Sequence, residues 1–163
     1  MSALSAKDIT ETTPIPMNFR EIAYGSDEYG QECLLREQVL RAPLKLSLRD
    51  EDLGGENEQM HFGLFQPGGG LLACLLAIQI DATGAKLRQM AVSPDHQRTG
   101  LGRKLMEEVE RNLHSRGFTR LTLHARATAA GFYQKLGWTT IGGEFEEVGI
   151  PHFKMEKTIG PGF

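Results

Sequence analysis

The fold of this chain of 163 residues is decided by one stretch, which reads Met90-Ala91-Val92-Ser93-Pro94 and, two residues later, Gln97-Arg98-Thr99-Gly100-Leu101-Gly102. A strand-like run over residues 85–92 precedes the loop, and an apolar stripe at helical spacing follows it from Leu101 to Leu113. The chain therefore passes from a strand through a glycine-containing loop into an amphipathic helix. Because backbone N–H groups at the start of a helix face outward, this arrangement predicts an anion-binding site.

The residues of this loop suit a pyrophosphate better than other phosphate motifs do. Gly100 and Gly102 let a phosphate approach the main chain, and Arg98 and Arg103 add positive charge nearby. A dinucleotide fingerprint would need a third glycine at Leu105, and a Walker loop would need Gly-Lys followed by Ser or Thr, which is absent. On this spacing alone, a purely structural role of the two glycines in a tight turn stays open.

Two motifs carry a resemblance to a known family. The stretch quoted above resembles the acyl-CoA-binding signature of the GNAT superfamily of N-acetyltransferases. A second stretch is similar to a later helix of that superfamily, and it reads Ala129-Ala130-Gly131-Phe132-Tyr133-Gln134-Lys135-Leu136-Gly137-Trp138. The two motifs occur in the family's order and cover roughly residues 85–140, so the chain is identified as a member of this superfamily.

The elements around the motifs predict an α+β domain. Strands are expected over residues 19–24, 59–65, 71–80, 85–92, 120–125, 138–141 and 150–157, and helices over residues 26–41, 101–116 and 128–136. Short turn-rich links imply that the second to fourth strands form an antiparallel meander. The resemblance implies a GNAT-like mixed, mainly antiparallel central sheet, with helices on both faces and a splayed parallel strand pair that forms the acyl-CoA cleft.

The first helix is expected to begin at Ser26, which can accept an N-cap hydrogen bond, and to end near Arg41 because Pro43 follows. Its apolar residues Tyr29, Cys33 and Leu40 recur at helical spacing and predict the buried face.

Composition indicates one soluble domain. Hydrophobic residues make up 40% of the chain and charged residues 24%, and the net charge of −3 disfavours nucleic-acid binding. No apolar run is long enough to cross a membrane, and the start lacks a secretory signal, so no membrane role and a cytoplasmic location are expected. The spacing of the two cysteines predicts neither a disulfide nor a metal site. We expect a flexible leader over residues 1–17 and a single domain over residues 18–160.

The resemblance implies that acetyl-CoA is the cosubstrate and assigns residues to it. Main-chain groups of Met90, Ala91 and Val92 are expected to pair with the pantetheine arm or to point at the thioester oxygen. At Arg126 the chain departs from the family, whose members often place there an Asn that contacts the cofactor. The implied cofactor-binding set is Met90, Ala91, Val92, Gln97, Arg98, Thr99, Gly100, Leu101, Gly102, Arg103, Arg126 and Phe132.

The resemblance further implies that an amine attacks the thioester directly. Tyr133 matches the family's proton donor to the CoA sulfur, although core packing would also explain a tyrosine there. The base stays open among five residues, of which His152 and Glu56 are carried forward as catalytic candidates: Glu56, Glu58, His61, His124 and His152.

The predicted function is transfer of an acetyl or short acyl group from acyl-CoA to a primary amine. The acceptor is expected to be a small-molecule amine or a peptide amine, bound by residues 24–62 and 142–155, and a homodimer is one option for the assembly. Two other classes stay open. A non-catalytic acyl-CoA-binding regulatory module would keep the phosphate loop without needing Tyr133, and a protein-interaction domain would not explain the loop.

Overall fold

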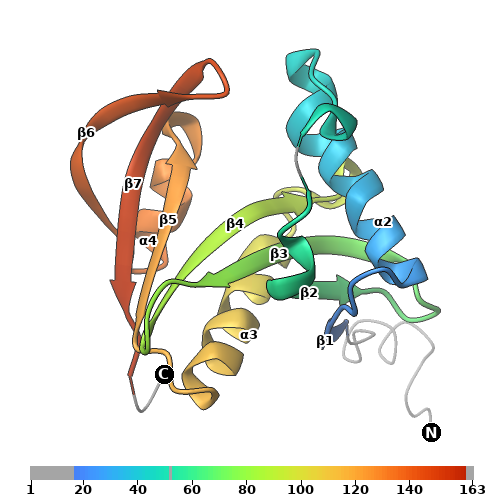
Figure 1. The fold of residues 1–163 in the computed structure, drawn as a ribbon, viewed down its shortest axis with the longest axis horizontal. Helices are drawn as coiled ribbons and strands as arrows, with labels where there is room; N and C mark the ends of the chain where they lie inside the picture. The colour runs from blue at the N-terminus through green and yellow to red at the C-terminus, as the bar shows by residue number, and fades with distance from the viewer. Residues whose placement is uncertain (1–16, 52, 161–163) are drawn as a thin grey trace, which may run out of the picture.

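The computed structural model describes residues 17–51 and 53–160. In this part of the chain one seven-stranded sheet has the order β1-β2-β3-β4-β5-β7-β6 (Figure 1). Its strands are β1 (Asn18–Glu21), β2 (Met60–Phe65), β3 (Leu71–Gln79), β4 (Gly84–Val92), β5 (Arg120–Arg126), β6 (Thr139–Glu147) and β7 (Ile150–Thr158). The α-helices are α2 (Asp27–Arg36), α3 (Leu101–Ser115) and α4 (Ala130–Lys135). Shorter helical turns are η1 (Glu37–Arg41), η2 (Ala42–Leu44), η3 (Leu48–Asp50), η4 (Glu56–Glu58), η5 (Pro94–His96) and η6 (Ala127–Ala129).

The sheet is mostly antiparallel. Strands β2 to β4 form the predicted meander, β1 pairs antiparallel with β2, and β7 pairs antiparallel with both β5 and β6. Only β4 and β5 pair in parallel, because α3 crosses between them. This mixed sheet with one parallel pair confirms the fold class predicted from the sequence.

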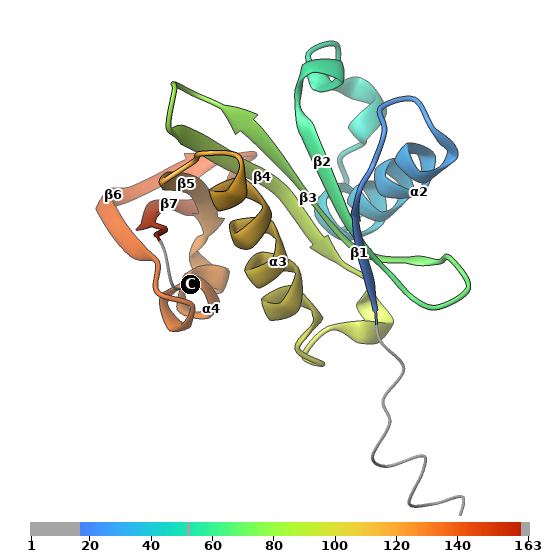
Figure 2. The same cartoon turned by 90° about the horizontal axis from the view of Figure 1, so that it is seen from below.

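Helices cover both faces of the sheet (Figure 2). The apolar stripe of α3 is fully buried at Leu105, Val109 and Leu113 and packs against one face of the meander. On the other face, α2 places Leu35 against Cys74 of β3. Neighbouring residues of a strand point to opposite faces, so the apolar run in β3 serves two cores at once.

The first helix differs from the sequence expectation in its end and in its buried face. Ser26 caps it as predicted, accepting a hydrogen bond from Tyr29 N at 3.1 Å. The α-helix ends at Arg36, however, and the chain continues as the π-helical turn η1 and the 3₁₀ turn η2, whose first positions include Pro43. Proline is tolerated there because the start of a helical turn needs no N–H donor.

The residues that α2 buries fully are Glu32, Leu35 and Arg36, whereas the predicted Tyr29 and Cys33 are half-buried. The expectation failed because two charged side chains neutralise each other: Arg36 Nη1 lies 2.9 Å from Glu32 Oε2. A paired charge can occupy a buried position that apolar periodicity assigns to hydrophobic residues.

The parallel pair separates along its length. Its register runs only from the Gly84–Arg120 pair to the Leu87–Leu123 pair, although β4 continues for five more residues to Val92. Beyond that point β5 stays paired with β7, up to Arg126 opposite His152. Figure 1 shows the two strands diverging from a common corner.

The expected leader lies, except for Met17, outside the described residues, and the domain bounds stay a prediction. Among the described residues, none of the helices has both the length and the apolar character needed to cross a membrane.

Candidate active site

The loop expected to bind phosphates lies between the end of β4 and the start of α3. Gly100 precedes the helix with a φ of +87°, and Arg98 also has a positive φ, of +65°. The first main-chain hydrogen bond of α3 runs from Lys104 N to Gly100 O at 3.0 Å. The three N–H groups before Lys104 therefore lie at the open start of the helix, where the helix dipole also favours an anion. This geometry suits a phosphate group.

Gly102 holds this loop close to the diverging strands. A Cβ atom at this position would lie 3.2 Å from Met90 Cε and 3.3 Å from Phe132 Cζ. A larger residue would therefore push the start of α3 away from β4 and α4. Phe132 is 37% exposed beside the loop. Two residues expected at the acyl-CoA site, Met90 and Phe132, thus border the phosphate loop.

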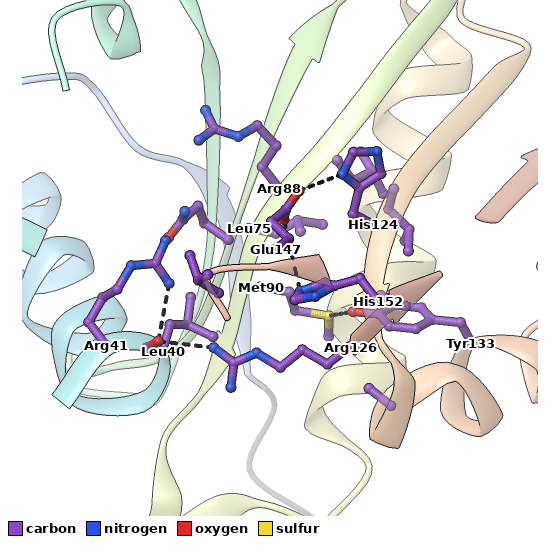
Figure 3. A pocket seen from close by; sticks show the side chains of 16 residues that line it. Leu40, Arg41, Leu75, Arg88, Met90, His124, Arg126, Tyr133, Glu147 and His152 are labelled. Atoms are coloured by element: carbon purple, nitrogen blue, oxygen red, sulfur yellow. Dashed lines mark hydrogen bonds and ion pairs between the residues drawn. The ribbon is translucent and has the colours of Figure 1, made fainter. Parts of the chain in front are cut away.

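A cavity of about 120 Å³ opens where β4 and β5 separate (Figure 3). On β4 the register with β3 shifts between Cys74 and Leu76, so Gln89 and Met90 together face the single residue Leu75. Gln89 has a φ of +57°. Such a β-bulge takes main-chain groups out of the ladder and redirects side chains toward a site. The bulge lies at the position where the family resemblance implies an N–H group for the thioester oxygen.

Tyr133 reaches the cavity from α4. Its hydroxyl group lies 3.4 Å from Met90 Sδ, within donating distance of the sulfur (Figure 3). Its ring packs edge-on against Phe132 and Trp138. Burial raises the pKa of Tyr133 to about 12, although the charge of Arg126 opposes this shift. The phenol is therefore neutral and carries its proton throughout the physiological pH range.

Two histidines and a carboxylate also line the cavity. His124 Nδ1 lies 2.8 Å from Glu147 Oε1, and His152 Nε2 lies 3.9 Å from Glu147 Oε2. His152 Nδ1 is 2.9 Å from the carbonyl oxygen of Ile150, so we assign the proton to Nδ1 and the free lone pair to Nε2. Partial burial raises the pKa of Glu147, but the hydrogen bond to His124 and the nearby charges of His124, His152 and Lys86 outweigh it and lower the pKa overall.

Glu147 was not among the residues predicted from the sequence. It is one of three acids within residues 144–147, and it follows the point between Ile141 and Phe145 where β6 shifts register against β7. No periodicity marks which of these acids faces His124. Only the expectation that residues 142–155 line the amine pocket pointed to this segment.

Arginines close the end of the cavity near α2. Arg126 Nη2 donates to the carbonyl oxygen of Leu40 at 2.9 Å, and Arg41 Nη1 donates to the same oxygen at 3.1 Å (Figure 3). Burial and the neighbouring charge of Arg41 lower the pKa of Arg126. Arg126 thus joins β5 to η1 across the opening between the strands.

Glu56, expected as a candidate base, does not line the cavity. It is buried, and Arg36 donates to both of its carboxylate oxygens, at 2.9 and 2.6 Å. Tyr29 donates to one of them at 2.7 Å. The same arginine lies 3.3 Å from the side-chain oxygen of Gln89 in the bulge. The sequence expectation for Glu56 is therefore corrected: its carboxylate is occupied in an ion pair and supports the bulge from behind.

The carboxylate oxygens of Glu32 and Glu56 and a ring nitrogen of His61, which could bind a metal ion, lie within 4.8 Å of one another. The guanidinium of Arg36 bonds to both carboxylates at this point, so a cation already fills the position that a metal ion would take.

The structure brings five of the predicted residues to one cavity: Met90, His124, Arg126, Tyr133 and His152. Phe132 and the loop over residues 97–103 lie next to this cavity, since Gly102 of the loop packs close to Met90 and Phe132. Val92 lies at the end of β4, where its carbonyl oxygen accepts a hydrogen bond from Gln97 Nε2 at 3.1 Å. The assigned roles of these residues stay predictions.

Comparisons with known proteins identify the family. Residues 47–159 match the family model described as an acetyltransferase (GNAT) domain. The uncharacterized protein YyaT of Bacillus subtilis (strain 168) is 40% identical over 75 residues, which are 46% of this chain and 51% of YyaT. The [ribosomal protein bS18]-alanine N-acetyltransferase of Escherichia coli (strain K12) is 39% identical over 72 residues, which are 42% of this chain and 49% of that protein.

A solved structure of an aminoglycoside 6′-N-acetyltransferase complexed with coenzyme A shares the fold. Its TM-score is 0.73 at 19% identity, and the match covers 89% of this chain and 98% of that one. The family model spans more than half of the chain, so the chain belongs to the GNAT acetyltransferase family. This confirms the family predicted from the two motifs. The chain spans about half the length of the curated relatives it matches.

Proposed function

We propose that this chain transfers an acetyl or short acyl group from acyl-CoA to a primary amine. The observation that carries the proposal is one cavity shared by a proton donor, a proton acceptor and a strand bulge: Tyr133, His152 and the Met90 segment. A non-catalytic acyl-CoA-binding module would need the phosphate loop but neither of the two proton-transfer groups. Release of free CoA thiol from acetyl-CoA in the presence of amines separates the two functions.

The chain's own residues fit an acyl-CoA ligand. The N–H groups before Lys104, with Arg98 and Arg103, would hold the pyrophosphate at the start of α3. The separated edges of β4 and β5 would receive the pantetheine arm next to Val92. The fold shared with a coenzyme A-bound acetyltransferase supports this placement.

Each proton transfer can be assigned to a side chain. His152 Nε2 would accept the proton that the amine loses as its nitrogen bonds to the acyl carbon. The main chain of the bulge at Met90 would stabilise the negative charge that develops on the acyl oxygen. Tyr133 would donate its proton to the sulfur as the carbon–sulfur bond breaks. No covalent enzyme intermediate is needed.

The acceptor can be a small molecule or a peptide. One relative is named for acetylating an alanine of a ribosomal protein and one structural neighbour for acetylating an aminoglycoside, so the family takes amines of both kinds. A homodimer and a cytoplasmic location stay predictions.

We expect Gly100→Val to weaken CoA binding by about tenfold or more, because a branched side chain at this position would project over the open start of α3. Isothermal titration with CoA measures the change. Gly117→Val is the matched control, since Gly117 has a φ of +98° and equally open surroundings at the other end of α3. Both variants carry the backbone strain of about 1–2 kcal/mol. Equal CoA affinity in the two variants would remove the loop from the binding site.

We expect His152→Gln to lower kcat by about a hundred- to ten-thousandfold, because it removes the proton acceptor from the cavity. CoA affinity should stay close to that of the wild type, since the phosphate loop is untouched. His114→Gln on α3 serves as the control. Full activity in His152→Gln together with a large loss in His124→Gln would assign the base to His124 instead.

A further inference from the structure

A second hollow of about 300 Å³ adjoins the first cavity. The two share Arg41, Arg88, His124 and Glu147, which Figure 3 shows around one opening. The second hollow adds Lys86 of β4 and Glu51. It therefore extends from the reacting centre along the first half of β4, away from the phosphate loop.

The charges in this hollow do not cancel. Arg41 is paired with Glu51, its Nη2 lying 3.2 Å from Glu51 Oε1, and Glu147 is hydrogen-bonded to His124. Arg88 donates only a long hydrogen bond of 3.4 Å to the neutral amide of Gln59. Within residues 17–51 and 53–160, neither Lys86 nor Arg88 has a carboxylate oxygen within 4.0 Å.

One carboxylate and two other cations act on Lys86. Burial lowers its pKa, the charge of Glu147 opposes this shift, and the charges of Arg88 and Lys154 lower the pKa further. The chain as a whole has a net charge of −3, so a local excess of cations is not a general property of its surface. An anion placed between Lys86 and Arg88 would relieve this repulsion.

The position of the two cations separates them from the acyl-CoA phosphates. Lys86 and Arg88 are two residues apart on β4, so they project from the same face. Val92, where the chain turns toward the phosphate loop, lies four residues beyond Arg88 and six beyond Lys86, which are distances of roughly 13 and 20 Å along a strand. The bulge at Met90 is only about 7 Å from Arg88 by the same rise. The cations thus lie within reach of a small acceptor and far from the pyrophosphate.

We propose that the acceptor amine also carries an anionic group, a carboxylate or a phosphate, which binds to Arg88 and Lys86 while the amine approaches His152 and Met90. This inference rests on the proposed acetyltransferase activity. It defines the acceptor class as small ω-amino acids and phosphorylated amines, and it gives Arg88 a specificity role that requires no part in proton transfer.

The test compares amine acceptors whose distal group is anionic, neutral or cationic, over a small range of chain lengths. Thiol release from acetyl-CoA is measured with 4-aminobutanoate and its shorter and longer homologues, with 3-aminopropyl phosphate, with butylamine and with cadaverine. We expect kcat/KM for the best anionic amine to exceed that of butylamine by about ten- to a hundredfold, as expected for hydrogen bonds to a charged group. The carboxylate and phosphate arms show which anion is preferred. Equal or better use of butylamine or cadaverine would overturn the proposal.

Two variants test the assignment to Arg88. Arg88→Gln should lower kcat/KM for the anionic amines by about ten- to a hundredfold and change that of butylamine by less than about twofold. Arg88→Glu should reverse the order, so that cadaverine becomes the best acceptor. Arg111→Gln, an exposed arginine of α3 paired with Glu108, is the control. A uniform loss for all amines in Arg88→Gln would mean that Arg88 only maintains the structure, which would contradict the proposal.

A binding measurement separates this inference from the proposed activity. Calorimetry with saturating CoA compares 4-acetamidobutanoate with N-butylacetamide and needs no turnover. Tighter binding of the acid to the wild type, lost in Arg88→Gln, supports the anion site even if no amine releases thiol, in which case only the proposed activity fails. Equal binding of the two amides would overturn the anion site, whatever the catalytic result.

Discussion

Tyr133→Phe should lower the rate of acyl transfer by about ten- to a thousandfold while CoA binds with nearly unchanged affinity. The substitution keeps the ring that packs edge-on against Phe132 and Trp138 and removes only the hydroxyl group beside Met90 Sδ. The leaving thiolate would then lack its neutral proton donor. The effect should therefore appear in the single-turnover rate constant, which product release does not mask.

The pKa of Tyr133 adds a second readout. Because burial raises it to about 12, deprotonation of Tyr133 should not reduce kcat until the pH approaches that value. A descending alkaline limb near pH 10, the ordinary range of a phenol, would therefore argue against Tyr133 as the acid. Tyr24→Phe, in which the tyrosine is 48% exposed on the first loop, is the matched control and should retain full activity. A wild-type chemical rate in Tyr133→Phe would leave this side chain with a packing role only.

The parts of the fold predicted best from the sequence are those in which apolar spacing and turn residues agree. The predicted bounds of the meander strands agree with the structure to within a residue or two, because the apolar runs end at the Gly-rich and Asp-containing turns. The start of α3 was placed correctly because Gly100 supplies the left-handed residue before an apolar helical stripe. The splay of β4 from β5 followed from family resemblance, since no local pattern indicates where a parallel ladder stops.

The sequence was less informative where charges are buried or where strands lose register. Glu56 was a candidate base because it is an acid in the segment expected to bind the amine. Its ion pair with Arg36 joins residues that are 20 positions apart in the sequence, so no local pattern indicates it. Glu147 was not predicted because its orientation depends on the register shift that precedes it in β6, between Ile141 and Phe145. In both cases the role of a carboxylate follows from its partner, and periodicity in one segment cannot identify a partner in another.

Removal of the buried cation should have the largest effect on stability. Arg36→Met leaves the carboxylates of Glu32 and Glu56 buried without their shared counter-ion, so the free energy of unfolding should fall by about 3–5 kcal/mol at pH 7. Arg111→Met is the matched control, because this exposed arginine contributes at most about 1 kcal/mol through its pair with Glu108. Urea denaturation of the three proteins measures the differences.

The pH dependence of this stability difference identifies its cause. In the wild type, burial tends to raise the pKa of Glu56, but the hydrogen bonds from Arg36 and Tyr29 outweigh it and lower the pKa overall. A lowered pKa contributes stability above the unfolded-state value of about 4.5, and this contribution is lost as the pH falls through the folded-state value. In Arg36→Met burial acts without the arginine and raises the pKa of the carboxyl, so acidification favours folding. The difference in the free energy of unfolding between the variant and the wild type should therefore narrow as the pH falls from 7 toward 4.5, whereas a difference caused only by lost packing would stay constant.

Because Arg36 also lies 3.3 Å from the side-chain oxygen of Gln89, kcat of the folded variant should fall as the bulge loses its support. Wild-type stability and kcat in Arg36→Met would show that the bulge at the acyl site is held by β3 and β4 alone.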